Sequence, residues 1–179
     1  SDYFVCAVPF FEVPRLFANN FDEVFESRFD LKYSPIVNIH LKFNRDISGI
    51  IDGRFLGLLG TTSQWVFRVK EDQVCVVISA AGKTTDMTKE AIAELAIKEL
   101  IECIPLFSGV NVVSTRVLKE MRATIVPDAE SLNNRPQNRT KIKNLLIAGD
   151  WTDTGLPSTI EGAVKSGKIS AEIIEKDKL

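Results

Sequence analysis

The sequence is poor in the features that most directly reveal a metal or disulfide protein. It has one histidine, His40, and its three cysteines lie in separate apolar runs without C-x-x-C spacing: Cys6, Cys75 and Cys103. This pattern predicts free, buried thiols, as in a reducing compartment, and neither a metal site nor a disulfide framework. The apolar runs are also shorter than the ~18 residues that a transmembrane helix requires.

An excess of charge of one sign is also missing. The chain has 22 basic and 24 acidic residues and no basic run. Nucleic-acid-binding proteins usually carry a basic patch, so we expect no nucleic-acid partner. The tripeptide Asn138-Arg139-Thr140 matches a glycosylation acceptor, but without a secretory signal we interpret it as an accident of composition.

The chain is rich enough in apolar residues to fold. With 179 residues, 45% of them hydrophobic, it can bury the core of one domain or of two small domains. It starts at Ser1 without methionine and runs directly into an apolar segment at residues 3–8, which is typical of a strand buried on both faces of a parallel sheet. Because domains seldom begin inside a buried strand, we expect a piece of a longer protein.

The next segment carries phenylalanines at a helical spacing. Four of them recur every fourth residue between Pro14 and Asp30 and predict one helix: Phe17, Phe21, Phe25 and Phe29. Such a stripe can pack on a core or form an aromatic wall for an apolar ligand, and core packing is the more common use.

A largely antiparallel sheet is predicted after this helix. Residues 36–43 alternate between apolar and polar, with His40 on the polar face, and similar short runs follow at 55–59, 64–69, 74–80 and 110–121. A catalytic role for His40 requires a partner that the sequence does not identify, which favours a surface or cleft histidine.

A phosphate-binding loop is suggested, but not completed, by Gly82-Lys83-Thr84. Val77 stands where that motif needs glycine, so we expect a helix start capped by Thr88 or Asp86. Residues 128–143 are polar and predict a loop without core residues, at which the chain crosses between domains.

A strand, a glycine corner and a helix follow each other between Asn144 and Gly167. The predicted strand ends at Ala148, Gly149 and Asp150 form the corner, and Ser158-x-x-Glu161 is a capping box. This order is typical of sites for a phosphate or a polar cofactor edge, because N–H groups at a helix start lack partners. A carboxylate there can accept hydrogen bonds from sugar or ribityl hydroxyls. The helix stripe predicted to face a neighbour comprises Ile160, Val164, Gly167, Ala171 and Ile174, with Gly162, Ala163 and Gly167 permitting close approach.

The same residues carry a family resemblance. LLIAGDWTDTGLPSTIEGAVKSGK resembles the C-terminal flavin-binding signature of the amine-oxidase-like flavoproteins, and within them AGDWT-x-TGLPSTIEGAV is most similar to the phytoene desaturase and hydroxysqualene dehydroxylase branch. SPIVNIHLKFNR, FLGLLGTTSQWVF and KEMRATIVP resemble segments of that branch's substrate domain. The family's N-terminal G-x-G-x-x-G, which grips the FAD pyrophosphate, is absent from the chain.

The resemblance implies a fold and a division of the chain. The fold class is α/β (α+β mixed), as a fragment of a two-domain FAD-dependent flavoprotein with an antiparallel substrate-domain sheet. Residues 1–12 would supply a strand of the FAD-binding domain, residues 13–126 part of the substrate-binding domain, and residues 127–179 the C-terminal strand and helix of the FAD-binding domain.

The resemblance also implies the roles of the corner residues. Asp150, after Gly149, would bond the ribityl chain of FAD. The backbone N–H groups of Thr159 and Ile160 would reach the pyrimidine edge of the flavin ring, where the helix N-terminus would stabilise reduced flavin. Two small residues would pack close to the cofactor: Gly162 and Ala163.

The implied function is that of an FAD-dependent oxidoreductase acting on a long isoprenoid, by hydroxysqualene dehydroxylation or by desaturation of a carotenoid precursor. The TGLPSTIEGAV run favours the first, and no residue stands out as catalytic. An amine oxidase is a second hypothesis, disfavoured because many amine oxidases carry an aromatic residue at the position of Thr159. A module that binds lipid or a partner without catalysis is the third. We expect a cytoplasmic protein, at most peripheral at membranes, and weak or no FAD binding by the 179 residues alone.

Overall fold

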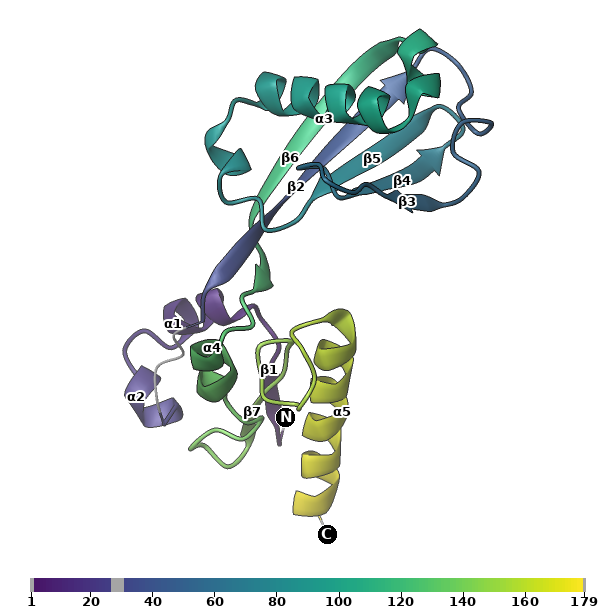
Figure 1. The fold of residues 1–179 in the computed structure, drawn as a ribbon. Coiled ribbons are helices and arrows are strands. Elements are labelled where there is room, and N and C mark those ends of the chain that lie inside the picture. Colours follow the sequence, from purple (N-terminus) through teal and green to yellow (C-terminus); the bar gives the residue numbers. More distant parts are fainter. Residues whose placement is uncertain (1, 27–30, 179) are drawn as a thin grey trace. The chain divides into compact units, whose positions relative to one another are not determined.

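The computed structural model of the chain describes residues 2–26 and 31–178. Contacts between Cα atoms divide it into two compact units, which we call unit 1 (Ser1–Lys32 and Thr124–Leu179) and unit 2 (Tyr33–Ala123). Both contain helices and strands (Figure 1), which confirms the mixed α/β class. By contacts, residues 13–32 belong with unit 1, whereas the sequence-based boundaries grouped them with residues 33–126.

Unit 2 is built on a five-stranded sheet. Its strands lie in the order β3 (Phe55–Gly57), β4 (Trp65–Lys70), β5 (Gln73–Ile78), β2 (Tyr33–Phe43) and β6 (Val112–Ile125). The pairs β3–β4, β4–β5 and β5–β2 are antiparallel. The antiparallel sheet predicted from alternation is therefore confirmed, with strand ends displaced by a few residues.

Helix α3 (Lys89–Cys103) covers one face of this sheet (Figure 1). The side chain of Thr88 accepts a hydrogen bond from the N–H of Ala91 at 3.2 Å, so the predicted cap is confirmed. Short 3-10 turns flank the helix at Thr84–Asp86 and Pro105–Gly109. The apolar positions of β2 turn toward the helix and are fully buried, as alternation predicts: Val37, Ile39, Leu41 and Phe43.

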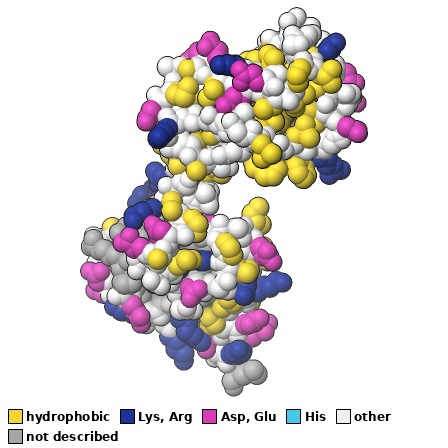
Figure 2. Space-filling model, viewed as in Figure 1, with side chains coloured by type: hydrophobic (Ala, Val, Ile, Leu, Met, Phe, Trp, Pro, Cys, Tyr) yellow, Lys and Arg dark blue, Asp and Glu magenta, His cyan; other side chains and the backbone are white. Residues whose placement is uncertain are grey.

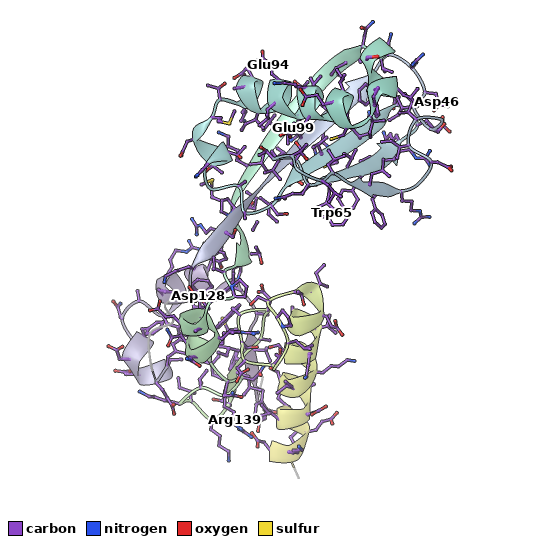
Figure 3. The ribbon with its side chains drawn as sticks, in the orientation of Figure 1. Asp46, Trp65, Glu94, Glu99, Asp128 and Arg139 are labelled. Atoms are coloured by element: carbon purple, nitrogen blue, oxygen red, sulfur yellow. The ribbon has the colours of Figure 1, made fainter. Side chains whose placement is uncertain are left out.

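The opposite face of the sheet carries aromatic side chains. Strand register places Phe55, Phe67, Cys75 and His40 in one row across the sheet, and Trp65 lies beside this row on β4. The rings of Phe55, Trp65 and Phe67 lie 6.0–6.4 Å apart and remain 40–57% exposed. Figure 2 shows apolar side chains gathered on this unit, and Figure 3 shows Trp65 pointing away from α3.

Unit 1 contains a two-stranded parallel sheet. Strands β1 (Phe4–Cys6) and β7 (Leu145–Ile147) pair from Phe4 with Leu145 to Cys6 with Ile147, so the prediction that both belong to one sheet is confirmed. The predicted burial of β1 on both faces is wrong, because Phe4 is 56% and Val5 45% exposed beside a single neighbouring strand. The prediction of buried thiols also fails for Cys103, which is exposed.

The single helix predicted from Pro14 to Asp30 is wrong. A 3-10 turn (Phe10–Glu12) and two four-residue helices, α1 (Val13–Leu16) and α2 (Phe21–Val24), stand in its place. Helix α1 ends at Leu16, and a turn over residues 17–20 leads to α2; this turn contains Asn19 and Asn20, residues that favour turns over helix interiors. Phe17 and Phe21 pack on buried Phe25 with ring centroids 5.4 and 4.8 Å away, as expected of core packing, while Phe29 lies outside the described residues.

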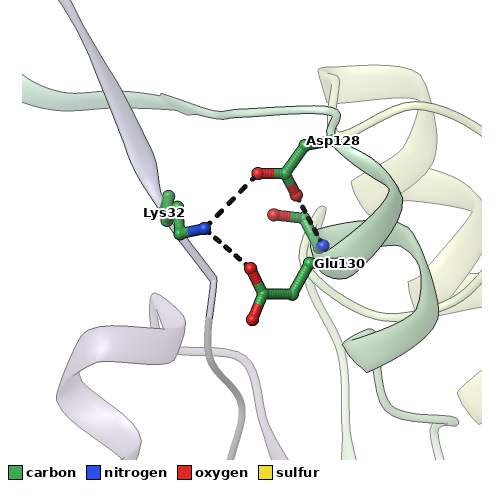
Figure 4. A network of polar contacts seen from close by, with 4 residues as sticks. Lys32, Asp128 and Glu130 are labelled. Atoms are coloured by element: carbon green, nitrogen blue, oxygen red, sulfur yellow. Dashed lines mark hydrogen bonds and ion pairs between the residues drawn. The ribbon is translucent and has the colours of Figure 1, made fainter.

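Residues 128–143 are also more structured than predicted. They contain α4 (Ala129–Asn134), whose first turn is capped by Asp128 through the N–H of Ser131 at 2.7 Å. The Lys32 ammonium lies 2.7 Å from Glu130 and 3.7 Å from Asp128 (Figure 4). The prediction of a loop without core residues is wrong, because Arg135 and Asn138 in this segment are buried.

Within the part of the chain that the structure describes, no helix is both long and apolar enough to cross a membrane. The same residues show no cluster of three histidine, cysteine or acidic side chains with the spacing for a metal ion.

Candidate functional site

The corner after β7 depends on glycine at position 149. Gly149 has a φ of +155°, and a Cβ atom there would lie 2.6 Å from Cδ1 of Trp151. The indole of Trp151 is buried and donates a hydrogen bond from Nε1 to the Val8 carbonyl at 3.1 Å. Any side chain at position 149 would therefore displace the ring that ties this corner to the N-terminal segment.

Asp150 presents a partly buried carboxylate directly after this glycine. Burial raises the pKa of this carboxyl group, while its own backbone N–H and the charge of Arg135 act in the opposite direction. Among the described residues, no other group donates a hydrogen bond to the carboxylate. It therefore keeps acceptor capacity for the hydroxyls of a ligand.

Helix α5 (Ile160–Asp177) begins one residue later than predicted. Thr159 is the N-cap, and its Oγ1 accepts a hydrogen bond from the N–H of Gly162 at 3.3 Å, so the capping box from Ser158 is wrong. The N–H groups of Ile160 and Glu161 have no acceptor within the helix, because they belong to its first turn. Neither N–H group forms a hydrogen bond with another described residue, so both donors are available to a ligand.

The tight start of α5 requires glycine at position 162. A Cβ atom at Gly162 would lie 2.5 Å from the Pro157 carbonyl oxygen. The N–H of the next residue, Ala163, bonds the Thr159 carbonyl at 2.9 Å, so it closes the first helical turn. Gly162 thus allows the preceding loop to lie directly against the helix, whereas no contact shows a need for a small residue at Ala163.

The face of α5 that packs is different from the predicted one. Its buried residues are Gly162, Ser166 and Ser170, whereas Ile160 is 86% and Val164 55% exposed. The other residues of the predicted stripe are exposed or half-buried: Gly167, Ala171 and Ile174. A Cβ atom at Gly167 would meet nothing within 4 Å, so close approach explains Gly162 but not Gly167.

A buried polar network, missed at the sequence level, explains why small hydroxylated residues pack here. Nδ2 of Asn138 lies 2.9 Å from the Ile147 carbonyl, 2.9 Å from Ser166 Oγ and 3.0 Å from Ser170 Oγ. Ser166 Oγ in turn accepts hydrogen bonds from the N–H of Gly149 at 3.1 Å and from Thr152 Oγ1 at 2.7 Å. This internal use of the Asn138 amide agrees with the interpretation of Asn138-Arg139-Thr140 as an accidental glycosylation match.

Arg135 is the second residue that sequence patterns did not indicate. It is 8% exposed, and its guanidinium group donates to three backbone carbonyls of one loop. Nη1 donates to Leu156 at 2.6 Å, and Nη2 donates to Asp150 at 2.9 Å and to Thr152. The sequence neighbours of Arg135 are polar, and its spacing matches no motif, as for the exposed Arg139. Its burial and its contacts are therefore visible only in the fold.

The corner has one carboxylate acceptor at the start of its loop and the N–H donors of the first turn of α5 at the end of that loop. This set suits a polyhydroxylated chain and the carbonyl edge of a heteroaromatic ring, as the ribityl chain and pyrimidine edge of a flavin present. The predicted residues Gly149, Asp150, Thr159 and Ile160 thus lie at the two ends of one loop. Their contacts with a cofactor stay a prediction.

Comparisons with known proteins agree with this chemistry. The family model described as "Flavin containing amine oxidoreductase" matches residues 1–174. The chain is 33% identical over 142 residues to hydroxysqualene dehydroxylase of Zymomonas mobilis, covering 79% of this chain and 33% of that protein. It is 27% identical over 195 residues to a 15-cis-phytoene desaturase of an Oncidium hybrid cultivar, covering 99% of this chain. It spans about a third of the length of these relatives.

Solved structures show the same fold at low sequence identity. A protein described as a protoporphyrinogen oxidase from Exiguobacterium sp. 255-15 matches 99% of this chain and 42% of its own, with a TM-score of 0.67 and 11% identity. Reduced UDP-galactopyranose mutase matches 74% of this chain and 31% of its own, with a TM-score of 0.55 and 14% identity. Since the family model spans nearly the whole sequence, this chain belongs to the flavin containing amine oxidoreductase family.

Proposed function

We propose that this chain supplies the ribityl-and-ring part of the FAD site in an oxidoreductase that acts on a long isoprenoid. The observation that carries the proposal is the strand–glycine–helix corner from Gly149 to Ala163. The chain belongs to a family of flavin-containing oxidoreductases, which supports flavin as the ligand of this corner. The hydroxysqualene dehydroxylases and phytoene desaturases among its relatives support an isoprenoid substrate over an amine.

Bound FAD would supply hydride transfer, and the residues of this chain would hold and tune it. Asp150 accepts hydrogen bonds from ribityl hydroxyls, and the first-turn N–H groups of α5 bond the pyrimidine edge. The positive end of this 18-residue helix then lies where negative charge develops on reduced flavin. We assign no residue of the chain to acid–base catalysis.

The exposed aromatic face of unit 2 supports an apolar substrate. Phe55, Trp65 and Phe67 offer a continuous ring surface, and their edge and tilted contacts hold the rings in place without closing the surface. A hydrocarbon chain gains about 25 cal/mol per Å² of apolar area that it buries on such a surface. Many amine oxidases carry an aromatic residue at the position of Thr159, and its absence here disfavours an amine substrate.

Between the two isoprenoid reactions we propose dehydroxylation of a hydroxylated triterpene. The support is the TGLPSTIEGAV segment and the identity to hydroxysqualene dehydroxylases, 32–33% against 24–27% to the phytoene desaturases. We also propose that the protein is cytoplasmic. Because such substrates partition into membranes, its contact with a membrane would be at most peripheral.

The test is purification and assay of the full-length protein. We expect a yellow protein that releases FAD on denaturation. With its flavin reduced, it should convert hydroxysqualene to squalene and water, consuming the two electrons of the reduced flavin. Reduction of oxidised flavin by phytoene, without turnover of hydroxysqualene, would favour desaturation instead. A colourless protein that releases no flavin would contradict the proposal as a whole.

A further inference from the structure

We infer that Arg135 is a positioning residue of the proposed flavin site, because its guanidinium group fixes the separation between Asp150 and the first turn of α5. This inference rests on the proposed function and assigns Arg135 no contact with the cofactor. The role of Arg135 would be to hold Asp150 and the first-turn N–H groups of α5 at a fixed separation, so that both can contact the same flavin.

The contacts of Arg135 join both ends of one loop. Nη2 holds the carbonyl of Asp150, the residue proposed to bond the ribityl chain, and also that of Thr152. Nη1 holds the carbonyl of Leu156 at 2.6 Å, three residues before the N-cap Thr159. The loop therefore cannot open without breaking charge-assisted hydrogen bonds.

A second contact transmits this constraint to the helix. The Pro157 carbonyl, directly after the clamped Leu156, lies against Gly162 so closely that no side chain fits between them. The position of Leu156 consequently determines where the first turn of α5 stands. The free N–H groups of Ile160 and Glu161 belong to that turn.

The choice of arginine fits a geometric role. A buried cation is costly, and no carboxylate forms an ion pair with Arg135 among the described residues. A hydrophobic residue would fill the same volume at lower cost if packing alone were required. Arginine offers a planar fork of five N–H donors, which can bond several carbonyls at once, whereas the lysine ammonium is a compact point charge.

Loosening this clamp should affect the cofactor in two ways. Asp150 and the α5 amides would no longer be preorganised for the same ligand, so FAD would bind more weakly. The helix N-terminus would also stabilise reduced flavin less, which lowers the midpoint potential of the bound flavin.

The experiment compares Arg135→Gln and Arg135→Lys with Arg139→Gln in the full-length protein. Arg139 is a matched control because it lies four residues away, its half-exposed side chain pairs with Asp177, and among the described residues it forms no hydrogen bond with the 150–156 loop. The readouts are the FAD dissociation constant by flavin fluorescence, the midpoint potential of the loaded fraction, and thermal unfolding of the apoprotein.

We expect Arg135→Gln to raise the FAD dissociation constant about tenfold or more and to lower the potential, Arg135→Lys to recover part of both, and Arg139→Gln to match wild type. If Arg135→Gln does not fold, Arg135→Lys alone must show both shifts. Wild-type potential and affinity in the Arg135 variants, even with lower thermal stability, would overturn the inference while leaving the flavin function intact. A wild-type protein without flavin would overturn both.

Discussion

The two units of the chain use their interiors differently. In unit 2 one apolar cluster extends from Val37 to Val117, between the sheet and α3. In unit 1 the apolar core is smaller, and that unit holds seven of the ten polar or charged residues that are buried in the described chain. These seven are Ser131, Arg135, Asn138, Thr152, Thr154, Ser166 and Ser170.

This difference follows the role of each unit. Apolar packing is non-directional and mainly stabilises, so it suits a platform whose outer face stays available. Directional hydrogen bonds fix backbone groups, and in unit 1 they converge on the corner around Gly149 and on the loop before α5. Unit 1 should therefore lose ligand geometry under substitutions that in unit 2 change only stability.

The largest effect on stability should come from the core of unit 2. Phe107 is 1% exposed and packs on Phe43 with ring centroids 5.2 Å apart. Phe107→Ala should lower the free energy of unfolding by about 3–5 kcal/mol, measured by urea denaturation. The control Phe55→Ala removes a ring that is 57% exposed and should cost less than about 1 kcal/mol. Equal losses in both variants would contradict the assignment of the core.

A polar substitution in unit 1 should come next. Asn138→Ala removes the amide that joins β7 to Ser166 and Ser170, so the buried Ile147 carbonyl and both serine Oγ atoms each lose one hydrogen bond. We expect a loss of about 2–3 kcal/mol, together with weaker FAD binding by the full-length protein. Asn133→Ala, at an exposed position of α4, is the control and should change neither. A stable Asn138→Ala protein with normal FAD affinity would show that the network does not organise the corner.

Glu99 should make the stability of unit 2 depend on pH. Its carboxylate accepts hydrogen bonds from the N–H groups of Thr62 and Ser63 at 2.8 Å each. Burial acts to raise the pKa of Glu99, but these bonds outweigh burial and leave the pKa below its usual value. A carboxyl group whose pKa is lower in the folded than in the unfolded state stabilises the fold at pH values above its unfolded-state pKa. This stabilisation is lost as the pH falls through the folded-state pKa.

Glu99→Gln should therefore cost about 1 kcal/mol at neutral pH and flatten the acid limb of the stability curve. Glu94→Gln is the matched control, because Glu94 lies on the same helix with an exposed side chain (Figure 3). Urea denaturation between pH 3 and pH 7 is the measurement. An acid limb unchanged by Glu99→Gln would show that other carboxylates cause it.

The smallest effect should come from the surface ion pairs of unit 1. The side chain of Lys32 is 54% exposed and that of its partner Glu130 is 53% exposed. Exposed pairs contribute little and are screened by salt, so Lys32→Gln should shift the melting temperature by less than about 2 °C. A larger shift that persists in high salt would mean that Lys32 has a packing role.

The sequence predicted best what depends on local patterns. Alternation in residues 36–43 predicts a strand with one buried face, and Thr88 is one of the two caps, with Asp86, that residue type and position predict. The parallel pairing of β1 with β7 followed from two short apolar segments without alternation. The alternation and the cap depend on groups within a few residues of each other, whereas the pairing of β1 with β7 joins distant segments and was inferred from their shared apolar character.

The sequence failed where distant polar contacts decide the structure. The apolar residues Ile160 and Val164 suggested the packing face of α5, but Ser166 and Ser170 are buried instead because Asn138 reaches them from another segment. The burial of Arg135 in its loop was missed for the same reason. Such pairings depend on contacts across 15–32 residues of chain and have no periodic signal.

The corner itself was located correctly, but the cofactor roles of its residues are still predictions. The most direct test is the FAD dissociation constant of Asp150→Ala in the full-length protein, with Asp153→Ala as the control. Asp153 lies in the same loop, but its carboxylate is engaged by Gln137 and the N–H of Gly155. We predict that Asp150→Ala weakens FAD binding about tenfold and that Asp153→Ala leaves it unchanged. Equal FAD affinity in the Asp150→Ala and wild-type proteins would contradict the assignment of this corner to the flavin.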